Sequence, residues 1–205
     1  MVYRFLPGQD NKLGEHLYQT PIEGLLYLEH KTSPDERGYY AELTRVPEIE
    51  QVLGASFDIK QINQSYSEQH VARGIHAENW NKLLTVVSGV CFCAWADLRS
   101  ESSTFGDVVS MEVGEFNGSV HGSVFVAAGI GNSFCVTKGP VRYLYCVDQL
   151  YAERDTNDDL AISLFDPDLA ISWPIKADEM VMSQRDRHCV TLRQAFTEKF
   201  AATSS

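Results

Sequence analysis

Hydrophobic and polar residues alternate along several short stretches of the chain, as they do in β-strands that bury one face. The alternation is clearest in residues 59–67 and 83–97, where β-branched and aromatic residues are common. It recurs less regularly in three further segments, residues 21–31, 107–126 and 141–151. Residues 39–42 are expected to begin another strand, because two tyrosines follow a turn. The pattern therefore predicts a protein built mainly of antiparallel strands.

Helix and turn signals are few. Residues 44–56 predict a short helix, because Pro47 falls near its first turn and Gly54 can end it. Residues 188–200 predict a final amphipathic helix. Turns are expected in residues 33–38 and at Asn117-Gly118, where proline, aspartate, asparagine and glycine gather.

The two ends of the chain lack a clear pattern. Residues 1–20 show no periodicity and are expected to form an extension that packs on the barrel or on a partner subunit. Residues 201–205 are expected to be a frayed tail. Because no linker or low-complexity segment interrupts the chain, residues 1–205 are expected to form a single domain.

Composition and charge narrow the choice of partners. With 205 residues, 44% of them hydrophobic and 22% charged, the chain has the composition of an ordinary globular protein. A net charge of -11 argues against nonspecific nucleic-acid binding, which needs a basic surface. We find no apolar run of membrane-spanning length and no secretory signal, and expect a cytoplasmic protein that does not associate with membranes. The five cysteines are interpreted as small buried hydrophobic residues in a reducing compartment.

The chemistry centres on Arg73-Gly74-Ile75-His76 and on Lys82, which lie where the two clearest strands meet. Rigid strands hold such side chains in place, and a barrel wall excludes water from them. Taken singly, each residue has a simpler explanation: a histidine in a strand is usually a packed or surface residue, and a lysine can lie at a sheet edge. Only their joint occurrence with further motifs favours a functional site.

Those motifs resemble the nucleotide-sugar 3,5-epimerases of the cupin class, whose best-known members act on dTDP-4-keto-6-deoxyglucose. The resemblance covers most of the chain. It rests on Q-x-N-x-S at 61–65, R-G-x-H at 73–76, D-x-R-G at 35–38, D-P-x-L-x-I-x-W-P at 166–174 and M-S-x-R-D at 182–186. It implies a cupin-type antiparallel jelly-roll barrel with a few short peripheral helices. It also implies a homodimer whose subunits share strands.

Four residues suit acid–base chemistry next to a ketone. His76 suits the base because an imidazole titrates near neutral pH, and the resemblance gives it Asp186 as a carboxylate partner. Tyr145 suits the acid that returns a proton to the opposite face of the sugar. Lys82 suits stabilisation of the enolate oxygen.

The remaining candidate residues would bind the substrate. Arginines suit a diphosphate because they form paired hydrogen bonds with phosphate oxygens, and the resemblance assigns the other residues to the sugar or the base. The predicted set is Arg37, Glu42, Gln61, Asn63, Arg73, Asn132, Tyr151 and Arg185. No cofactor is implied. No metal is expected either, because His76-Ala77-Glu78 has one histidine and Asn132, a poor ligand for transition metals, stands where the family usually has another.

The resemblance leaves three functions open. The first is cofactor-independent inversion of C3 and C5 of a dTDP-4-keto-6-deoxyhexose through an enolate, in the biosynthesis of a deoxysugar such as rhamnose. The second is inversion of one carbon only, or of another nucleotide sugar. The third is a nucleotide-sugar-binding cupin without turnover. Asn132 and Ala77, which depart from the family pattern, bear on the choice.

Overall fold

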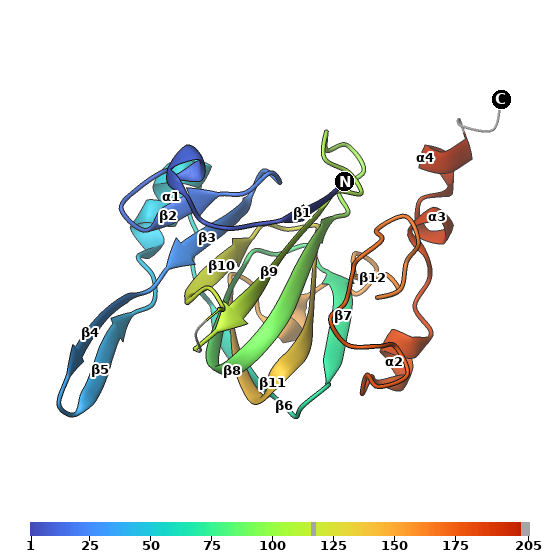
Figure 1. Ribbon diagram of the computed structural model, residues 1–205. Helices are drawn as coiled ribbons and strands as arrows, with labels where there is room; N and C mark the ends of the chain where they lie inside the picture. Colours follow the sequence, from blue (N-terminus) through green and yellow to red (C-terminus); the bar gives the residue numbers. More distant parts are fainter. Residues whose placement is uncertain (116–117, 202–205) are drawn as a thin grey trace.

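The computed structural model describes residues 1–115 and 118–201. Figure 1 shows strands rolled into a barrel, with one hairpin extending from its side and short helices gathered near the C-terminus. The strands are β1 (Val2–Arg4), β2 (Leu17–Gln19), β3 (Leu25–Glu29), β4 (Lys31–Asp35), β5 (Gly38–Glu42), β6 (Gln61–Ser67), β7 (Ala72–Ala77), β8 (Lys82–Asp97), β9 (Val108–Gly114), β10 (Gly122–Val126), β11 (Ile130–Val147) and β12 (Leu160–Ala161). The prediction of an all-β protein with a few short helices is confirmed.

The helices lie outside the barrel wall. They are η1 (Gln9–Asn11), α1 (Val46–Leu53), η2 (Tyr151–Glu153), α2 (Gln184–Arg187), α3 (Leu192–Ala195) and α4 (Thr197–Ala201). The predicted helix at 44–56 is confirmed as α1, which has proline in its first turn and ends at Gly54 in the left-handed conformation. No helix in residues 1–115 or 118–201 is long and apolar enough to cross a membrane.

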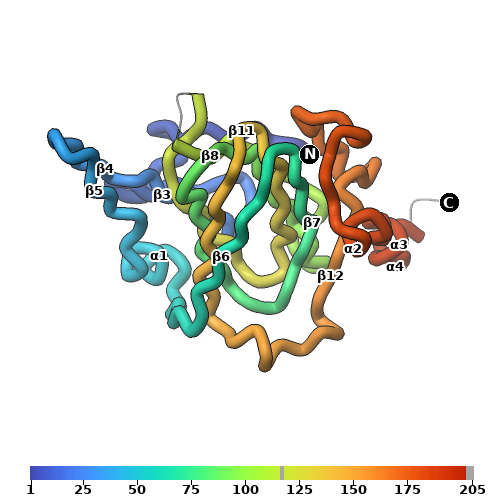
Figure 2. Tube along the Cα trace, turned by 90° about the horizontal axis from the view of Figure 1, so that it is seen from below, coloured from blue at the N-terminus to red at the C-terminus, as the bar shows by residue number. Residues whose placement is uncertain are grey.

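Two long strands organise the barrel. β8 and β11 pair with each other along most of their length, and each changes its second neighbour midway. β8 pairs with β10 at its start and with β9 at its end. β11 pairs with β7 near its start and with β6 near its end. One sheet thus folds over on itself, and its strands surround a shared interior (Figure 2).

The fold-over occurs at a bulged corner. Gly89 of β8 has a φ of +77°, and a Cβ atom there would lie 2.6 Å from the carbonyl oxygen of Pro140. The pairing of β8 with β11 shifts register between Val136 and Tyr143, on the opposite side of the corner. A glycine is needed because the two backbones approach too closely for any side chain.

The core is continuous with the barrel interior. Trp95, Tyr27 and Tyr143 are among its largest fully buried side chains. A second cluster, which includes Ile162 and Leu192, fixes the C-terminal segment against the outer face of the barrel. All five cysteines are unpaired, and Cys91, Cys93 and Cys135 are buried.

Two predicted boundaries differ in the structure. Residues 1–20 do pack on the barrel, one of the two expected alternatives, through β1, which pairs in parallel with β9, and β2, which pairs with β3. The turn predicted at 33–38 is confined to residues 36–37, because residues 33–35 belong to β4 and Gly38 begins β5. Pro34 is tolerated in β4 because a two-stranded hairpin leaves one edge free. The strand predicted at 141–151 ends at Val147, and Tyr151 begins η2.

The helix predicted at 188–200 was also wrong in its extent. Thr191 caps the start of α3 through its side chain, so residues 188–191 lie outside the helix. Phe196 leaves the helical conformation and separates α3 from α4. Asn117, in the predicted Asn117-Gly118 turn, and residues 202–205 of the predicted tail lie outside the described residues.

Candidate active site

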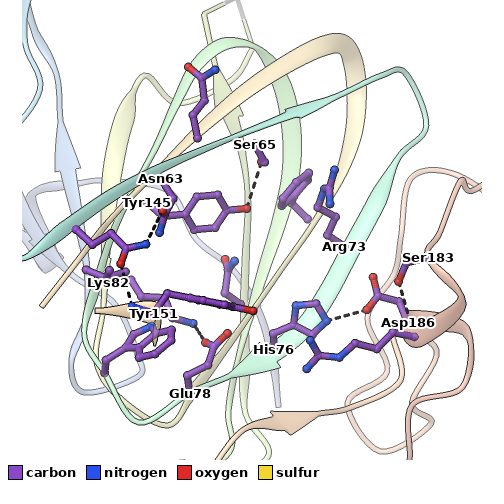
Figure 3. Close-up of a pocket in the computed structure, with 17 residues that line it drawn as sticks. Asn63, Ser65, Arg73, His76, Glu78, Lys82, Tyr145, Tyr151, Ser183 and Asp186 are labelled. Carbon is purple, nitrogen blue, oxygen red and sulfur yellow. Dashed lines mark hydrogen bonds and ion pairs between the residues drawn. The ribbon is translucent and has the colours of Figure 1, made fainter. Parts of the chain in front are cut away.

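A cavity of about 580 Å³ opens inside the barrel between β6, β7, β8, β11 and the C-terminal segment. It collects ten of the twelve predicted site residues from distant parts of the sequence (Figure 3). The ten are His76, Lys82, Tyr145, Asp186, Gln61, Asn63, Arg73, Asn132, Tyr151 and Arg185. The candidate acid, base and lysine therefore share one open cavity.

His76 and Asp186 form a hydrogen-bonded pair. His76 Nε2 lies 2.7 Å from Asp186 Oδ1, and the aspartate side chain is only 4% exposed. Burial would raise the pKa of Asp186, but the hydrogen bond and charge of His76 outweigh it and hold that pKa below its usual value. An ionised carboxylate only accepts hydrogen bonds, so Nε2 carries the imidazole proton. In the neutral form of the imidazole, Nδ1 then carries the free lone pair and can act as a base.

The strand that carries His76 is held tightly against β11. Gly74 has a φ of +120°, and a Cβ atom there would lie 2.4 Å from the Cβ of Ser133. This contact explains the glycine of Arg73-Gly74-Ile75-His76, because any side chain would push β7 away from its neighbour. On the far side, Asp186 is placed by α2, where Ser183 Oγ accepts a hydrogen bond from the Asp186 backbone N–H.

Lys82 is the most buried cation of the cavity. It is the first residue of β8, it is 5% exposed, and its ammonium group forms an ion pair with the carboxylate of Glu78. The pairing fixes the position of the lysine, because a buried charge is stable only when it is paired and hydrogen-bonded. The ammonium group has three N–H donors, and those not used by Glu78 are available to a ligand oxygen.

Tyr145 reaches the cavity from β11. Its hydroxyl lies 3.4 Å from Ser65 Oγ of β6, and its ring packs 5.0 Å from that of Tyr143. Burial raises the pKa of Tyr145 to about 12, although the hydrogen bond with Ser65 and the charge of Arg73 act in the opposite direction. The side chain therefore stays protonated at neutral pH and can act as an acid.

Asn132 lies beside the base. It is the direct partner of His76 in the pairing of β11 with β7, so both side chains face the same side of the sheet. It is 8% exposed, and its Oδ1 accepts a hydrogen bond of 3.5 Å from the hydroxyl of Tyr143. That contact directs the amide Nδ2, a neutral donor, away from Tyr143.

The other end of the cavity is lined by amides and aromatic rings. Gln61 Nε2 donates to Asn63 Oδ1 at 2.7 Å, and Gln61 Oε1 accepts from the backbone N–H of Tyr151 at 2.9 Å. The ring of Tyr151 lies 6.3 Å from that of Trp80, and the guanidinium of Arg154 covers one of its faces at 3.7 Å. An aromatic wall with adjacent amides is suited to a planar heterocycle.

Two arginines give the cavity further positive charge. Arg73 of β7 extends toward the end of β6, where its Nε donates to Ser67 Oγ at 3.1 Å. Arg185 lies in α2, next to Asp186, and also lines the cavity. Both could pair with an anionic group of a ligand in the cavity.

Two predicted site residues, Arg37 and Glu42, do not line the cavity of their own chain. They lie on the hairpin of β4 and β5, which extends away from the barrel (Figure 1). There Arg37 pairs with Asp35 at 2.5 Å, and Glu42 pairs with Arg45 at 2.8 Å. Within one chain they do not line the cavity, and their contact with the ligand stays a prediction.

Several residues of the cavity were missed by sequence reasoning. They are Gln64, Ser65, Glu78, Trp80, Phe134, Val147 and Ser183. A simple signal could have identified two of them: Ser65 alternates with Gln61 and Asn63 on β6, and Glu78 lies two residues after His76. Trp80 lies in the connection between β7 and β8, where period-two reasoning does not apply.

The arrangement can move protons to and from carbon. A base oriented by a carboxylate, a phenol and a lysine share one cavity and come from separate strands. Among residues 1–115 and 118–201, no three His, Cys, Asp or Glu side chains are grouped so as to hold a metal ion. The fold and the cavity together define a cupin-type barrel with acid–base machinery.

Comparison with known proteins gives the same class. The family model for dTDP-4-dehydrorhamnose 3,5-epimerase matches residues 19–194. A dTDP-4-dehydrorhamnose 3,5-epimerase from Methanothermobacter thermautotrophicus is 29% identical over 181 residues, which cover 86% of this chain and 94% of the relative. The chain belongs to the dTDP-4-dehydrorhamnose 3,5-epimerase family, a family of isomerases.

Solved structures agree with this assignment. NovW, a 4-keto-6-deoxy sugar epimerase from the novobiocin gene cluster of Streptomyces spheroides, matches with a TM-score of 0.80 at 27% identity, covering 92% of this chain and 94% of that chain. ChmJ, a 3'-monoepimerase from Streptomyces bikiniensis solved with dTDP-quinovose, matches with a TM-score of 0.74 at 26% identity, covering 89% of this chain and 96% of that chain. The similar structures thus include an epimerase named for a single position.

Proposed function

We propose that the protein is a cofactor-independent epimerase that inverts C3, C5 or both in a dTDP-4-keto-6-deoxyhexose, in the biosynthesis of a deoxysugar such as rhamnose. The observation that carries the proposal is the 2.7 Å hydrogen bond between His76 and Asp186 in the cavity that also holds Tyr145 and Lys82. The 4-keto group acidifies the C–H bonds next to it, so a single base, an acid and an oxyanion donor suffice.

The reaction begins at His76. Nδ1 takes the proton from the carbon next to the ketone, and Asp186 stabilises the imidazolium that results. The electron pair of the broken C–H bond moves onto the ketone oxygen, and the ammonium of Lys82 stabilises that enolate. Tyr145 then donates its phenolic proton to the opposite face of the same carbon, which inverts the stereocentre. Water returns a proton to Tyr145 and removes one from His76.

The rest of the cavity would hold the nucleotide. Gln61, Asn63 and Tyr151 form its amide and aromatic end, which suits the base. Arg73 and Arg185 suit the diphosphate, and Asn132 would donate to a sugar oxygen near His76. These roles place the sugar between the base and the acid.

A homodimer would complete the site. The cavity offers three cationic side chains, Arg73, Lys82 and Arg185, against the carboxylates of Glu78 and Asp186. This leaves little positive charge for a diphosphate. The hairpin of β4 and β5, hereafter the arm, carries Arg37 and Glu42 outward, with Tyr40 74% exposed. We infer that the arm reaches the cavity of a second copy.

We also infer that the protein works in the cytoplasm, because its five unpaired cysteines would stay reduced there.

The test is proton NMR with dTDP-4-keto-6-deoxyglucose in D2O. Deuterium at C3 and C5 of the product is the expected result for a double epimerase. Deuterium at one carbon would instead establish the single-carbon enzyme, a second candidate favoured by the uncharged Asn132 opposite His76. Binding without exchange would contradict both and indicate a binding protein.

Equilibrium sedimentation would test the dimer, since a monomer at micromolar concentration would exclude it.

A further inference from the structure

The hydroxyl of Tyr145 lies against a serine for which the scheme above has no use. Ser65 Oγ is 3.4 Å from the Tyr145 hydroxyl, and both residues line the cavity (Figure 3). Either oxygen can donate in the resting protein. Because a serine hydroxyl rotates freely, it can switch between accepting and donating as its neighbour changes charge.

The position of Ser65 follows from strand register. β6 pairs with β11 so that Asn63 is opposite Tyr145 and Ser65 is opposite Tyr143. Ser65 is therefore the diagonal neighbour of Tyr145 on the same face of the sheet, within reach of a long side chain. Ser65 shares this face with Gln61 and Asn63, whereas Ile62 and Tyr66, on the opposite face, are 65% and 46% exposed. The contact is thus built into the sheet and does not depend on a loop.

A buried phenol that acts as an acid faces a specific difficulty. When Tyr145 gives its proton to carbon, the phenolate keeps the electron pair of the broken O–H bond. Burial disfavours that charge and raises the pKa of Tyr145 to about 12, whereas the hydrogen bond with Ser65 and the positive charge of Arg73 favour it. Of these two groups, Ser65 is the one within hydrogen-bonding distance.

We propose that Ser65 is a positioning residue for the reaction: its hydroxyl holds the Tyr145 phenol toward the sugar and donates a hydrogen bond to the phenolate formed on protonation of the enolate. Ser65 keeps its own proton throughout, so the step transfers only the phenolic proton, from oxygen to carbon. The inference rests on the proposed function, because it takes Tyr145 as the acid.

The consequence is a specific partition of the enolate. The enolate can take a proton from Tyr145, which gives inversion, or regain one from His76, which restores the starting configuration. Without the Ser65 hydroxyl, the first route slows and the second is unchanged. In D2O, the second route places deuterium in recovered, uninverted substrate whenever the imidazolium has exchanged with solvent. The ratio of exchange to inversion therefore reports on Ser65.

The experiment compares wild-type protein with Ser65→Ala in D2O, using NMR to follow deuterium in recovered substrate and in inverted product. Inversion should fall about tenfold, the effect of losing one hydrogen bond to a charged group. Deuterium entry into recovered substrate should stay within about threefold of wild type, as should the dissociation constant for dTDP. A loss of structure alone would lower both rates together.

A matched pair of variants isolates the hydroxyl. Threonine and valine have nearly the same shape, and both suit a strand. Ser65→Thr should keep the wild-type ratio of exchange to inversion, whereas Ser65→Val should raise it about tenfold. This pair also decides the question if Ser65→Ala fails to fold. Ser163→Ala is the control, because Ser163 lies outside the cavity, where its Oγ accepts from the backbone N–H of Phe165.

The outcomes separate this inference from the proposed function. If wild-type protein catalyses neither exchange nor inversion, the proposed function fails. If wild-type protein is active and Ser65→Val keeps the same exchange-to-inversion ratio as Ser65→Thr, the role of Ser65 is wrong and the function stands. A higher ratio in both β-branched variants would also overturn it, because bulk and not the hydroxyl would then be responsible.

Discussion

The cavity and the arm present predicted ligand-binding residues in opposite ways. In the cavity, Lys82 and Asp186 are each 5% exposed, and each is paired: Lys82 with Glu78 and Asp186 with His76. On the arm, Tyr39 is 57% exposed and Tyr40 is 74% exposed, and among the described residues Arg37 forms its ion pair with Asp35 of the same hairpin. One region brings the candidate acid, base and lysine together within a single chain. The other has side chains suited to a ligand but no ligand site within that chain.

The difference indicates where rigidity is needed. A proton transfer depends on positions held to a fraction of an ångström, so its groups lie on paired strands. A contact with a diphosphate tolerates a longer and more flexible connection. Four changes, ordered by the size of their expected effect, test this division between cavity and arm.

The largest loss should come from His76→Asn. The variant removes the base but keeps a polar side chain, so deuterium exchange in D2O should fall roughly 10²- to 10⁴-fold. Affinity for dTDP, measured by calorimetry, should change little. A variant that kept its full rate would show that His76 is not the base.

Lys82→Ala should cost somewhat less. Removing one donor to a developing oxyanion lowers turnover by a factor on the order of 10² to 10³. Turnover should fall more than affinity, because the enolate forms only during the reaction. Lys60→Ala is the control, since this lysine does not line the cavity. Equal losses of turnover and affinity would argue that Lys82 binds the substrate in its ground state.

Arg37→Ala should weaken substrate binding roughly tenfold and leave turnover at saturation nearly intact. The sharper form of this experiment mixes Arg37→Ala and Lys82→Ala subunits after co-expression. If the arm acts on the partner, the mixed dimer regains one site with both residues present, and activity at low substrate rises above that of either variant. If the arm acts within its own chain, the mixture gains nothing.

The smallest effect should be the one that Asp186→Asn has on the free energy of unfolding, through loss of the ion pair between His76 and Asp186. Because the pKa of Asp186 is lowered in the folded protein, its ionised form contributes stability above the ordinary aspartate pKa of about 4. That contribution is lost as pH falls from about 4 through the lowered pKa. The difference in unfolding free energy between wild type and Asp186→Asn should therefore shrink, by at most about 1 kcal/mol, between pH 5 and pH 3 in urea titrations. A constant difference would contradict the lowered pKa.

Sequence reasoning succeeded where a local pattern and a motif coincided. The helix α1 was predictable because Pro47 and Gly54 mark its two ends. The strand positions of His76, Lys82 and Tyr145 were predictable, because all three lie in regular strands and His76 also belongs to the R-G-x-H motif. The pairing that brings them together could not be deduced from periodicity, since it depends on the corner at Gly89 and on the long contact between β8 and β11.

It failed where tertiary partners decide local structure. β1 is three residues long and exists because β9 offers it an edge, so residues 1–20 carry no pattern of their own. The helix predicted at 188–200 was interrupted because capping at Thr191 and the departure at Phe196 override its amphipathic spacing. Glu78 was weighed only as a metal ligand, although its ion pair with Lys82 places it inside the cavity.

The attachment of Asp186 has a consequence for the life of the newly made chain. The strands that carry His76, Lys82 and Tyr145 end at Val147, whereas Asp186, the hydrogen-bond partner of His76, follows in α2. During synthesis from the N-terminus, the barrel strands leave the ribosome first, and the base gains its partner only when the last part of the chain folds back. A ribosome-stalled or proteolytically shortened chain that lacks α2 would bear a shaped pocket with an unoriented imidazole. Such a fragment would compete for nucleotide sugar without converting it.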